Sequence, residues 1–211
     1  MQTDLVKKWV SKNGVAITDA QLALLEQHQN MVLETNKHMN LTAITDPKEF
    51  AIKHIADSLT ILPYVPREAK LADIGTGAGF PGLVLAIMRE DLHVTLVDSL
   101  RKRVFFLQEA VSKLGLQNVE CVHTRAEDLA RVGITFDICV ARAVARMDKL
   151  VRWTLPITKP GGTFLAMKGP DISDELENAE PALEKLGGYV KSVDLVEITP
   201  GLVHSIVVIT K

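Results

Sequence analysis

The chain has 211 residues, of which 47% are hydrophobic and 24% are charged, a composition typical of a globular protein. Its formal net charge of −2 excludes a uniformly basic nucleic-acid-binding protein. The two cysteines, Cys121 and Cys139, are too few for a disulfide framework or a cysteine-rich metal cluster, and we predict no metal site. No apolar run reaches the roughly 20 residues of a membrane helix, and the first residues lack a signal-peptide pattern. We therefore expect a cytoplasmic protein that does not associate with a membrane.

Residues 1–66 are expected to form a helical N-terminal extension. From Asp19 onward apolar residues recur at helical spacing, and Thr18 or Asp19 is a suitable N-cap for this helix. A second helix is predicted after Asp46 and Pro47, because a capping residue followed by proline is typical of a helix start. Two prolines in segment 63–66 end this helix and predict the boundary to a second domain, residues 67–211.

The second domain is expected to alternate strands with helices. Amphipathic stretches such as 101–114 and 171–186 predict helices. Such an alternation is typical of βαβ units and of a mostly parallel sheet. The short apolar runs that predict its strands are 71–74, 93–97, 119–123, 136–141 and 163–167.

The last part of the chain has a different pattern. Two strand-like runs, 189–198 and 203–210, are joined by a short turn that contains Pro200 and Gly201. This arrangement predicts a hairpin, so the last strand should run antiparallel to the rest of the sheet. Such an α/β sheet resembles the Rossmann-like class I methyltransferase order 3-2-1-4-5-7-6, which differs from the six-strand dinucleotide-binding fold.

A glycine-rich segment, 73–82, follows the first predicted strand of this sheet. Gly77, Gly79 and Gly82 match the pyrophosphate loop G-x-G-x-x-G, which alone is weak evidence. Asp73 and Gly75 with Gly77 and Gly79 match the acidic loop D-x-G-x-G-x-G of S-adenosylmethionine enzymes. A carboxylate suits a ligand that carries an ammonium and a sulfonium group, whereas it would repel a pyrophosphate. The segment therefore favours S-adenosyl-L-methionine over a nicotinamide cofactor, with a turn that binds no ligand as the alternative.

Two further positions agree with a nucleoside cofactor. Asp98 ends the second predicted strand, where a carboxylate can accept both ribose hydroxyls of an adenosine; capping the following helix is its alternative role. Arg125, Ala126 and Glu127 follow the third strand, where the adenine edge should lie. A backbone N–H and an acid at this point can recognise the ring nitrogen and the amino group of adenine.

Taken together, the motifs resemble the bacterial 16S ribosomal RNA guanine-N7 methyltransferase G family, also called glucose-inhibited division protein B. The resemblance covers residues 36–169, and no motif position departs from the family pattern. It rests on segments 40–44, 73–82, 97–99, 125–127, 141–145 and 167–169, together with Lys102, Arg103, Phe106 and Leu107.

This resemblance implies a reaction, a partner and a set of cofactor contacts. The reaction is methylation of N7 of guanine 527 in the 530-loop of 16S ribosomal RNA, and the partner is that RNA or a small-subunit particle. No obligate protein partner is evident from the sequence. Because guanine N7 carries a free lone pair, methyl transfer needs positioning and no general base. The implied cofactor contacts are Gly75, Phe80, Ala126, Glu127 and Arg142, with Asp98 on the ribose.

The basic side chains of the chain are concentrated in its middle. Residues 99–152 carry 10 Lys and Arg against 6 acids, whereas the acidic segment 171–211 is interpreted as solvated. Most of the basic side chains should lie at the carboxyl ends of strands, as phosphate and base contacts or as ordinary surface charge. Arg142 and Lys168 are the candidates for a catalytic role. The predicted RNA contacts are Arg101, Lys102, Arg103, Arg125, Arg146 and Lys168.

Several alternatives remain open at this point. His54 and Asp57, one helical turn apart, could face the crevice or form a structural hydrogen bond. Cys139 lies inside a predicted strand and is interpreted as a core residue. The embedded G-x-G-x-x-G pattern keeps an NAD-dependent oxidoreductase as the second hypothesis, although a hydride-transfer motif with tyrosine is not evident. A non-catalytic RNA-binding protein with the same fold is the third.

Overall fold

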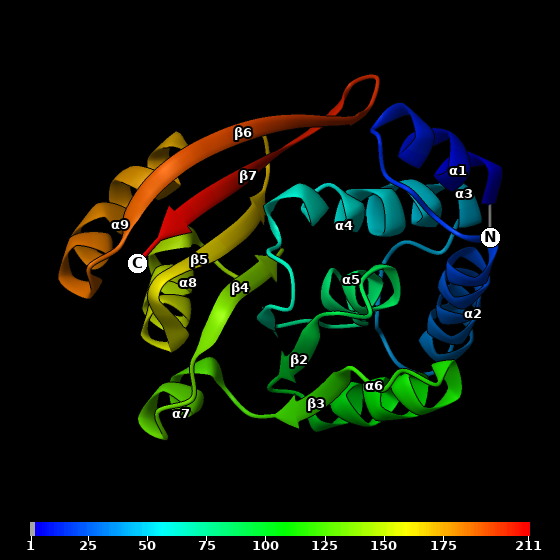
Figure 1. The fold of residues 1–211 in the computed structure, drawn as a ribbon, viewed down its shortest axis with the longest axis horizontal. Helices are drawn as coiled ribbons and strands as arrows, with labels where there is room; N and C mark the ends of the chain where they lie inside the picture. Colours follow the sequence, from blue (N-terminus) through cyan, green and yellow to red (C-terminus); the bar gives the residue numbers. More distant parts are fainter. Residues whose placement is uncertain (1–2) are drawn as a thin grey trace.

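The computed structural model describes residues 3–211, which form a seven-stranded sheet with helices on both faces (Figure 1). The strand order is β3-β2-β1-β4-β5-β7-β6, and only β7 runs antiparallel to its neighbours, as predicted. The strands are β1 Lys70–Ile74, β2 His93–Asp98, β3 Val119–His123, β4 Phe136–Arg142, β5 Thr158–Lys168, β6 Tyr189–Thr199 and β7 Leu202–Thr210. The order changes direction beside β1, so the chain leaves the adjacent carboxyl ends of β1 and β4 toward opposite faces of the sheet, and a crevice opens between these connections.

The helices on one face come mainly from the N-terminal third of the chain. Their apolar side chains share one hydrophobic cluster with α5 and α6 and with the strands beneath (Figure 1). The domain boundary between residues 66 and 67 stays a prediction. The helices on this face are α1 Thr3–Lys12, α2 Asp19–Asn36, α3 Pro47–Phe50, α4 Asp57–Leu59, α5 Gly82–Met88 and α6 Arg101–Leu114.

Local sequence signals explain where these helices begin and end. Thr18 caps α2 in a reciprocal capping box with Gln21. Asp46 accepts hydrogen bonds from two backbone N–H groups of α3, in which Pro47 is the first residue. Gly115 ends α6 with a left-handed backbone conformation, φ +68°. The predicted helix starts at Thr18 and Asp46 are thereby confirmed.

Between α3 and α4 the helix widens into a π-helical turn, Ala51–Ala56. This turn follows Phe50, which is fully buried, and contains His54. Single π-helical turns of this kind are frequently found at functional sites. The sequence pattern predicts one regular helix here, and the structure corrects this expectation.

The other face of the sheet is covered by α7 Ala126–Arg131, α8 Met147–Thr154 and α9 Ser173–Leu186, which pack on a second hydrophobic cluster (Figure 1). Helices α7 and α8 are absent from the sequence-based expectations, and α1 lies in the predicted helical extension without being predicted as a separate helix. The β6–β7 hairpin reaches across the sheet to α1, where the Trp9 indole donates a hydrogen bond to the Ile198 carbonyl at 2.9 Å. This contact joins helix α1 to the tip of the β6–β7 hairpin. Within the described residues, no helix combines the length and the apolar character needed to cross a membrane.

Candidate functional site

The crevice consists of two adjoining hollows that share Gly75. The larger hollow, of about 530 Å³, is lined by the glycine-rich loop, by the π-helical turn and by the carboxyl ends of β4 and β5. The smaller hollow, of about 270 Å³, lies between the ends of β2 and β3 and helix α7. Together they have the size of a site for one small ligand with room for part of a second.

The glycine-rich loop uses two of its glycines for different reasons. Gly77 has φ +62°, and a Cβ atom there would meet nothing within 4 Å, because the residue faces the larger hollow. At Gly82 a Cβ atom would lie 2.6 Å from Leu96 and 2.8 Å from Asp73. Glycine is therefore required at Gly82 so that α5 can approach the sheet, whereas at Gly77 it is favoured by the left-handed backbone conformation.

Asp73 lies beneath this loop and is fully buried. Its Oδ2 accepts hydrogen bonds from the Thr76 hydroxyl at 2.6 Å and from the Gly82 N–H at 2.7 Å. Among the described residues, Oδ1 has no hydrogen-bond partner. Burial raises the pKa of Asp73 to about 6, although these two hydrogen bonds oppose the shift. The carboxylate thus holds the loop from below.

Asp98 connects the loop to the start of α6. Its Oδ2 accepts a hydrogen bond from the Gly77 N–H at 3.0 Å and faces the Arg103 guanidinium at 3.5 Å. Its Oδ1 accepts from the Leu100 N–H at 2.8 Å, so the alternative role at the helix start is also present. Asp98 lines the smaller hollow together with Arg125, Ala126 and Glu127.

The smaller hollow also has two apolar lining residues for which the sequence predicts no contact with the cofactor. Trp153 from α8 and Val144 from the loop after β4 form its apolar wall. Both come from a part of the chain in which no helix is predicted. With Ile74, Val97 and Ala126 they give this hollow apolar lining next to the polar groups of Asp98 and Glu127, a combination that suits a nucleoside.

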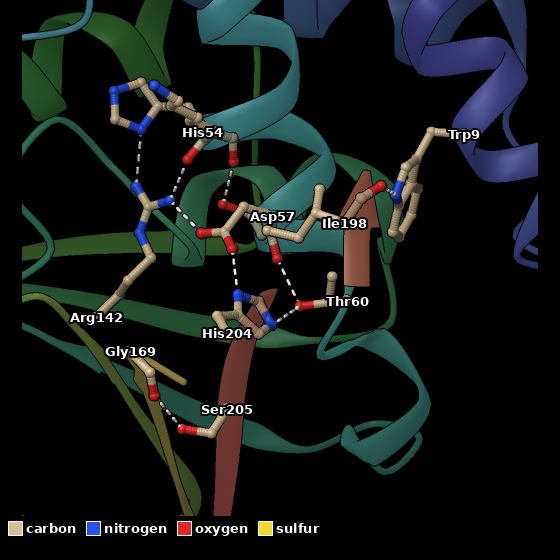
Figure 2. A network of polar contacts seen from close by, with 11 residues as sticks. Trp9, His54, Asp57, Thr60, Arg142, Gly169, Ile198, His204 and Ser205 are labelled. Carbon is tan, nitrogen blue, oxygen red and sulfur yellow. Dashed lines mark hydrogen bonds and ion pairs between the residues drawn. The ribbon is translucent and has the colours of Figure 1, made fainter. Parts of the chain in front are cut away.

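Arg142 and Asp57 are at the centre of a buried polar network beside the larger hollow (Figure 2). Nη1 of Arg142 donates to Oδ2 of Asp57 at 2.6 Å and to the Lys53 carbonyl at 2.9 Å. Nη2 of Arg142 donates to Nδ1 of His54 at 3.0 Å, and His204 contacts the other carboxylate oxygen of Asp57. His54 and Asp57 therefore both face the crevice and form structural hydrogen bonds.

The protonation state of His54 follows from its partners. Because an arginine can only donate, Nδ1 of His54 accepts, and its Nε2 carries the proton that is donated to the Thr42 hydroxyl oxygen at 2.8 Å. Burial and the charge of Arg142 lower the pKa of His54 to about 3. His54 is thus neutral near pH 7, and its basic nitrogen is already occupied.

Phe80 connects this network to the N-terminal helices through stacked rings. The Phe80 ring lies 4.5 Å from the parallel His54 ring and 5.3 Å from the Arg142 guanidinium. His28 of α2 is buried 5.0 Å from the same ring, and its Nε2 donates to the Ala78 carbonyl at 2.8 Å. The helical extension therefore supports the glycine-rich loop directly.

The predicted basic contacts divide into three groups. Arg103, Arg142 and Lys168 line the larger hollow and Arg125 lines the smaller one. Lys102 borders a shallow depression next to Asn40, outside the crevice. Two others, Arg101 and Arg146, are exposed and line neither hollow of the crevice.

The two cysteines and the carboxylates show no arrangement for covalent or metal chemistry. Burial raises the pKa of Cys139 to about 12 and that of Cys121 to about 11, so both thiols are protonated near pH 7. Cys139 is fully buried in the core, in agreement with the interpretation from the sequence. Among residues 3–211 no group of His, Cys, Asp and Glu is arranged to hold a metal ion.

Comparison with known proteins gives matches over almost the whole chain. A family model described as rRNA small subunit methyltransferase G matches residues 21–201. The ribosomal RNA small subunit methyltransferase G of Desulforamulus reducens is 45% identical, over 86% of this chain and 78% of that protein. Its namesake from Clostridium perfringens strain 13 is 44% identical, over 99% of this chain and 90% of that protein. A solved structure of a SAM dependent methyltransferase from Aquifex aeolicus shares the fold, with a TM-score of 0.58 and 20% identity, over 82% of this chain and 97% of that one.

Proposed function

Because this chain belongs to the rRNA small subunit methyltransferase G family, we propose that its target is N7 of guanine 527, in the 530-loop of 16S ribosomal RNA. Membership of the family makes the chain an S-adenosylmethionine-dependent methyltransferase of ribosomal RNA, and it excludes the NAD-dependent oxidoreductase and the non-catalytic protein. We place the reaction in the cytoplasm, on the RNA itself or on a small-subunit particle.

The residues of the crevice fit S-adenosylmethionine. The unpartnered Oδ1 of Asp73 leaves a buried carboxylate beneath the loop, which a positively charged ligand above the loop would stabilise. Gly77 leaves open space for that ligand, and the smaller hollow accommodates an adenine ring. We propose that the cofactor is held by Gly75, Gly77, Gly79, Phe80, Asp98, Ala126, Glu127 and Arg142, with Asp73 acting through the loop.

The observation that supports the choice of N7 is that the candidate bases His54 and Asp57 of the larger hollow are already engaged, while Glu175 is held in an ion pair with Lys168. His54 is neutral and its Nδ1 accepts a hydrogen bond, whereas both oxygens of Asp57 are engaged by Arg142 and His204. The bound cofactor supplies an electrophilic methyl group on a sulfonium. A nucleophile that carries no proton, such as guanine N7, can attack it without a base. The protein then contributes position, which can lower a barrier by about 7–11 kcal/mol.

Methyl transfer to undermethylated small-subunit particles and to free 16S ribosomal RNA tests this proposal. With tritiated S-adenosylmethionine we expect one methyl group per RNA, and strand cleavage chemistry specific for 7-methylguanine should map it to guanine 527. A particle that is already modified at this position serves as the control and should accept no label. A methyl group on another atom or another base would contradict the assignment of N7.

RNA binding should depend on exposed basic side chains at the start of α6. Arg101 and Lys102 are exposed there, whereas Arg103 contacts Asp98 and is unsuitable for a test of RNA binding alone. If both contact phosphates, the Arg101→Ala/Lys102→Ala variant should reduce the slope of log affinity against log salt by about 1.4–1.8. The measurement is RNA binding between low and moderate salt, with S-adenosylmethionine affinity as a second readout that should not change.

Lys113→Ala is the matched control, because Lys113 is exposed at the other end of the same helix. This variant should retain the wild-type slope. An unchanged slope in the double variant would place the RNA-binding surface elsewhere, and Arg146 at the start of α8 would be tested next.

A further inference from the structure

Lys168 and Glu175 form an ion pair at the wall of the larger hollow, on the side formed by β5 and α9. Their Nζ and Oε2 atoms are 2.6 Å apart, and the two side chains are only 11% and 24% exposed. Nζ of Lys168 also donates to the Ala145 carbonyl at 2.9 Å, and Oε2 of Glu175 accepts from the Met147 N–H at 2.8 Å. Both side chains are therefore held in place before any ligand binds.

Each member of this pair retains unused hydrogen-bonding capacity. An ammonium group has three protons, and two of those of Lys168 are used by Ala145 and Glu175. Within the described chain, Oε1 of Glu175 receives no hydrogen bond. Asp57, the other carboxylate of this hollow, has both oxygens engaged. Oε1 of Glu175 is thus a carboxylate oxygen that can accept hydrogen bonds from a ligand in the larger hollow.

A guanine presents a matching set of groups. Its O6 accepts, whereas N1–H and the 2-amino group, on the edge away from N7, donate. We propose that Lys168 donates a hydrogen bond to O6 of the target guanine while Glu175 accepts from N1–H and the 2-amino group, so that this pair selects guanine over other bases. The inference rests on the proposed function, because it assumes a guanine with N7 turned toward the cofactor. Unstacked RNA bases are commonly recognised in this way, through their Watson–Crick edge.

The same contact should favour the reaction as well as binding. Methylation of N7 makes the guanine ring cationic and its N1–H more acidic. A hydrogen bond from N1–H to the Glu175 carboxylate is therefore stronger in the transition state than in the bound substrate. Loss of this carboxylate should accordingly lower the rate constant of the bound complex and not only the affinity for RNA.

Replacement of the target guanosine by inosine tests the contact between Glu175 and the 2-amino group, because inosine lacks only this group. We use 16S ribosomal RNA ligated with either nucleoside at the target position and reconstituted into small-subunit particles. In single-turnover methylation the wild-type enzyme should react about 10- to 100-fold more slowly with inosine, the usual effect of losing a hydrogen bond to a charged group. In Glu175→Gln the single-turnover rate with guanosine should be lower than in the wild type. The ratio of the rate with guanosine to the rate with inosine should approach one in this variant. Any effect of inosine on the RNA itself is common to both enzymes and cancels when the guanosine-to-inosine rate ratio of the variant is divided by that of the wild type.

Two further variants make the result decisive. Glu177→Gln changes the same charge on an exposed position of the same helix and should keep the wild-type ratio. Glu175→Asp retains the charge with a shorter side chain and should also lose the discrimination, so it replaces Glu175→Gln if that protein does not fold. A wild-type ratio in folded Glu175→Gln or Glu175→Asp would overturn the inference. A methyl group mapped to an atom other than N7 would instead remove its premise, the proposed function.

Discussion

RNA that carries 7-deazaguanine at the target position is expected to bind the enzyme with nearly normal affinity and to accept no methyl group. Replacement of N7 by carbon removes the lone pair that attacks the methyl group, while O6, N1–H and the 2-amino group are kept. The expected effect is complete loss of methyl transfer, measured by tritium incorporation in single turnovers, together with an unchanged dissociation constant for the RNA. Residual methylation at the wild-type rate would mean that another atom is the nucleophile.

The pH profile provides the control for this interpretation, because a nucleophile without a proton needs no base. With saturating RNA and cofactor, the rate should vary little between about pH 6.5 and 8.5, where a catalytic base would produce a limb. His54, with its pKa lowered to about 3 by burial and Arg142, is neutral throughout this range, and the buried thiol of Cys139 stays protonated. Cys139→Ser should keep its activity per folded molecule. A roughly tenfold rise per pH unit would contradict the N7 assignment and leave the cofactor assignment intact.

The parts of the fold that could be predicted are those whose signals are local. Strand β3, Val119–His123, and helix α6, Arg101–Leu114, begin and end where the sequence pattern predicts. Helix α6 has a clear apolar stripe and a glycine at its end. The predicted sheet order is confirmed as well, because alternating strands and helices followed by a hairpin restrict the possible topologies.

The start of β5 shows why other boundaries could not be predicted. The strand begins at Thr158 and not near Thr163, and it passes through Pro160, Gly161 and Gly162, which are typical of a turn. These residues form a bulge opposite β4, and two backbone hydrogen bonds join them to Lys211 at the other end of the domain. A contact across so many residues gives no local signal in the sequence.

The residues of the crevice also divide into those with a local signal in the sequence and those placed by distant contacts. The sequence indicates Asp73, Gly75 and Asp98, because strand ends and glycine spacing place them at one edge of a parallel sheet. It does not indicate His204, which lies in an apolar strand and meets Asp57 from a position 147 residues away. The acidic segment that contains Glu175 is interpreted from the sequence as solvated, whereas Glu175 lines the larger hollow. Contacts of this kind depend on how β5, β7 and the N-terminal helices pack.

Asp57→Asn is expected to lower the free energy of unfolding by about 3–5 kcal/mol, because it breaks a buried ion pair by removing one partner. The Asp57 carboxylate joins α4 to Arg142 at the end of β4 and to His204 on β7 (Figure 2). Its removal leaves the Arg142 guanidinium, which is only 14% exposed, without a counter-charge. Urea unfolding of both proteins near pH 7 measures the difference. Glu109→Ala, which breaks an exposed pair with Lys113, is the control and should cost no more than about 0.5 kcal/mol.

The effect of Asp57→Asn should also depend on pH in a direction that the structure fixes. Burial alone would raise the pKa of Asp57, but the hydrogen bond from His204 and the charge of Arg142 outweigh it and hold the pKa below its ordinary value. A carboxyl group whose pKa is lower in the folded state stabilises the fold above its unfolded pKa of about 4, and this contribution is lost as the pH falls through the folded value. The difference between wild type and Asp57→Asn should therefore be constant near neutral pH and shrink as the pH decreases below about 4. A difference that instead grew in acid, or that stayed below about 1 kcal/mol at pH 7, would show that the Arg142–Asp57–His204 contacts do not hold the N-terminal helices to the sheet.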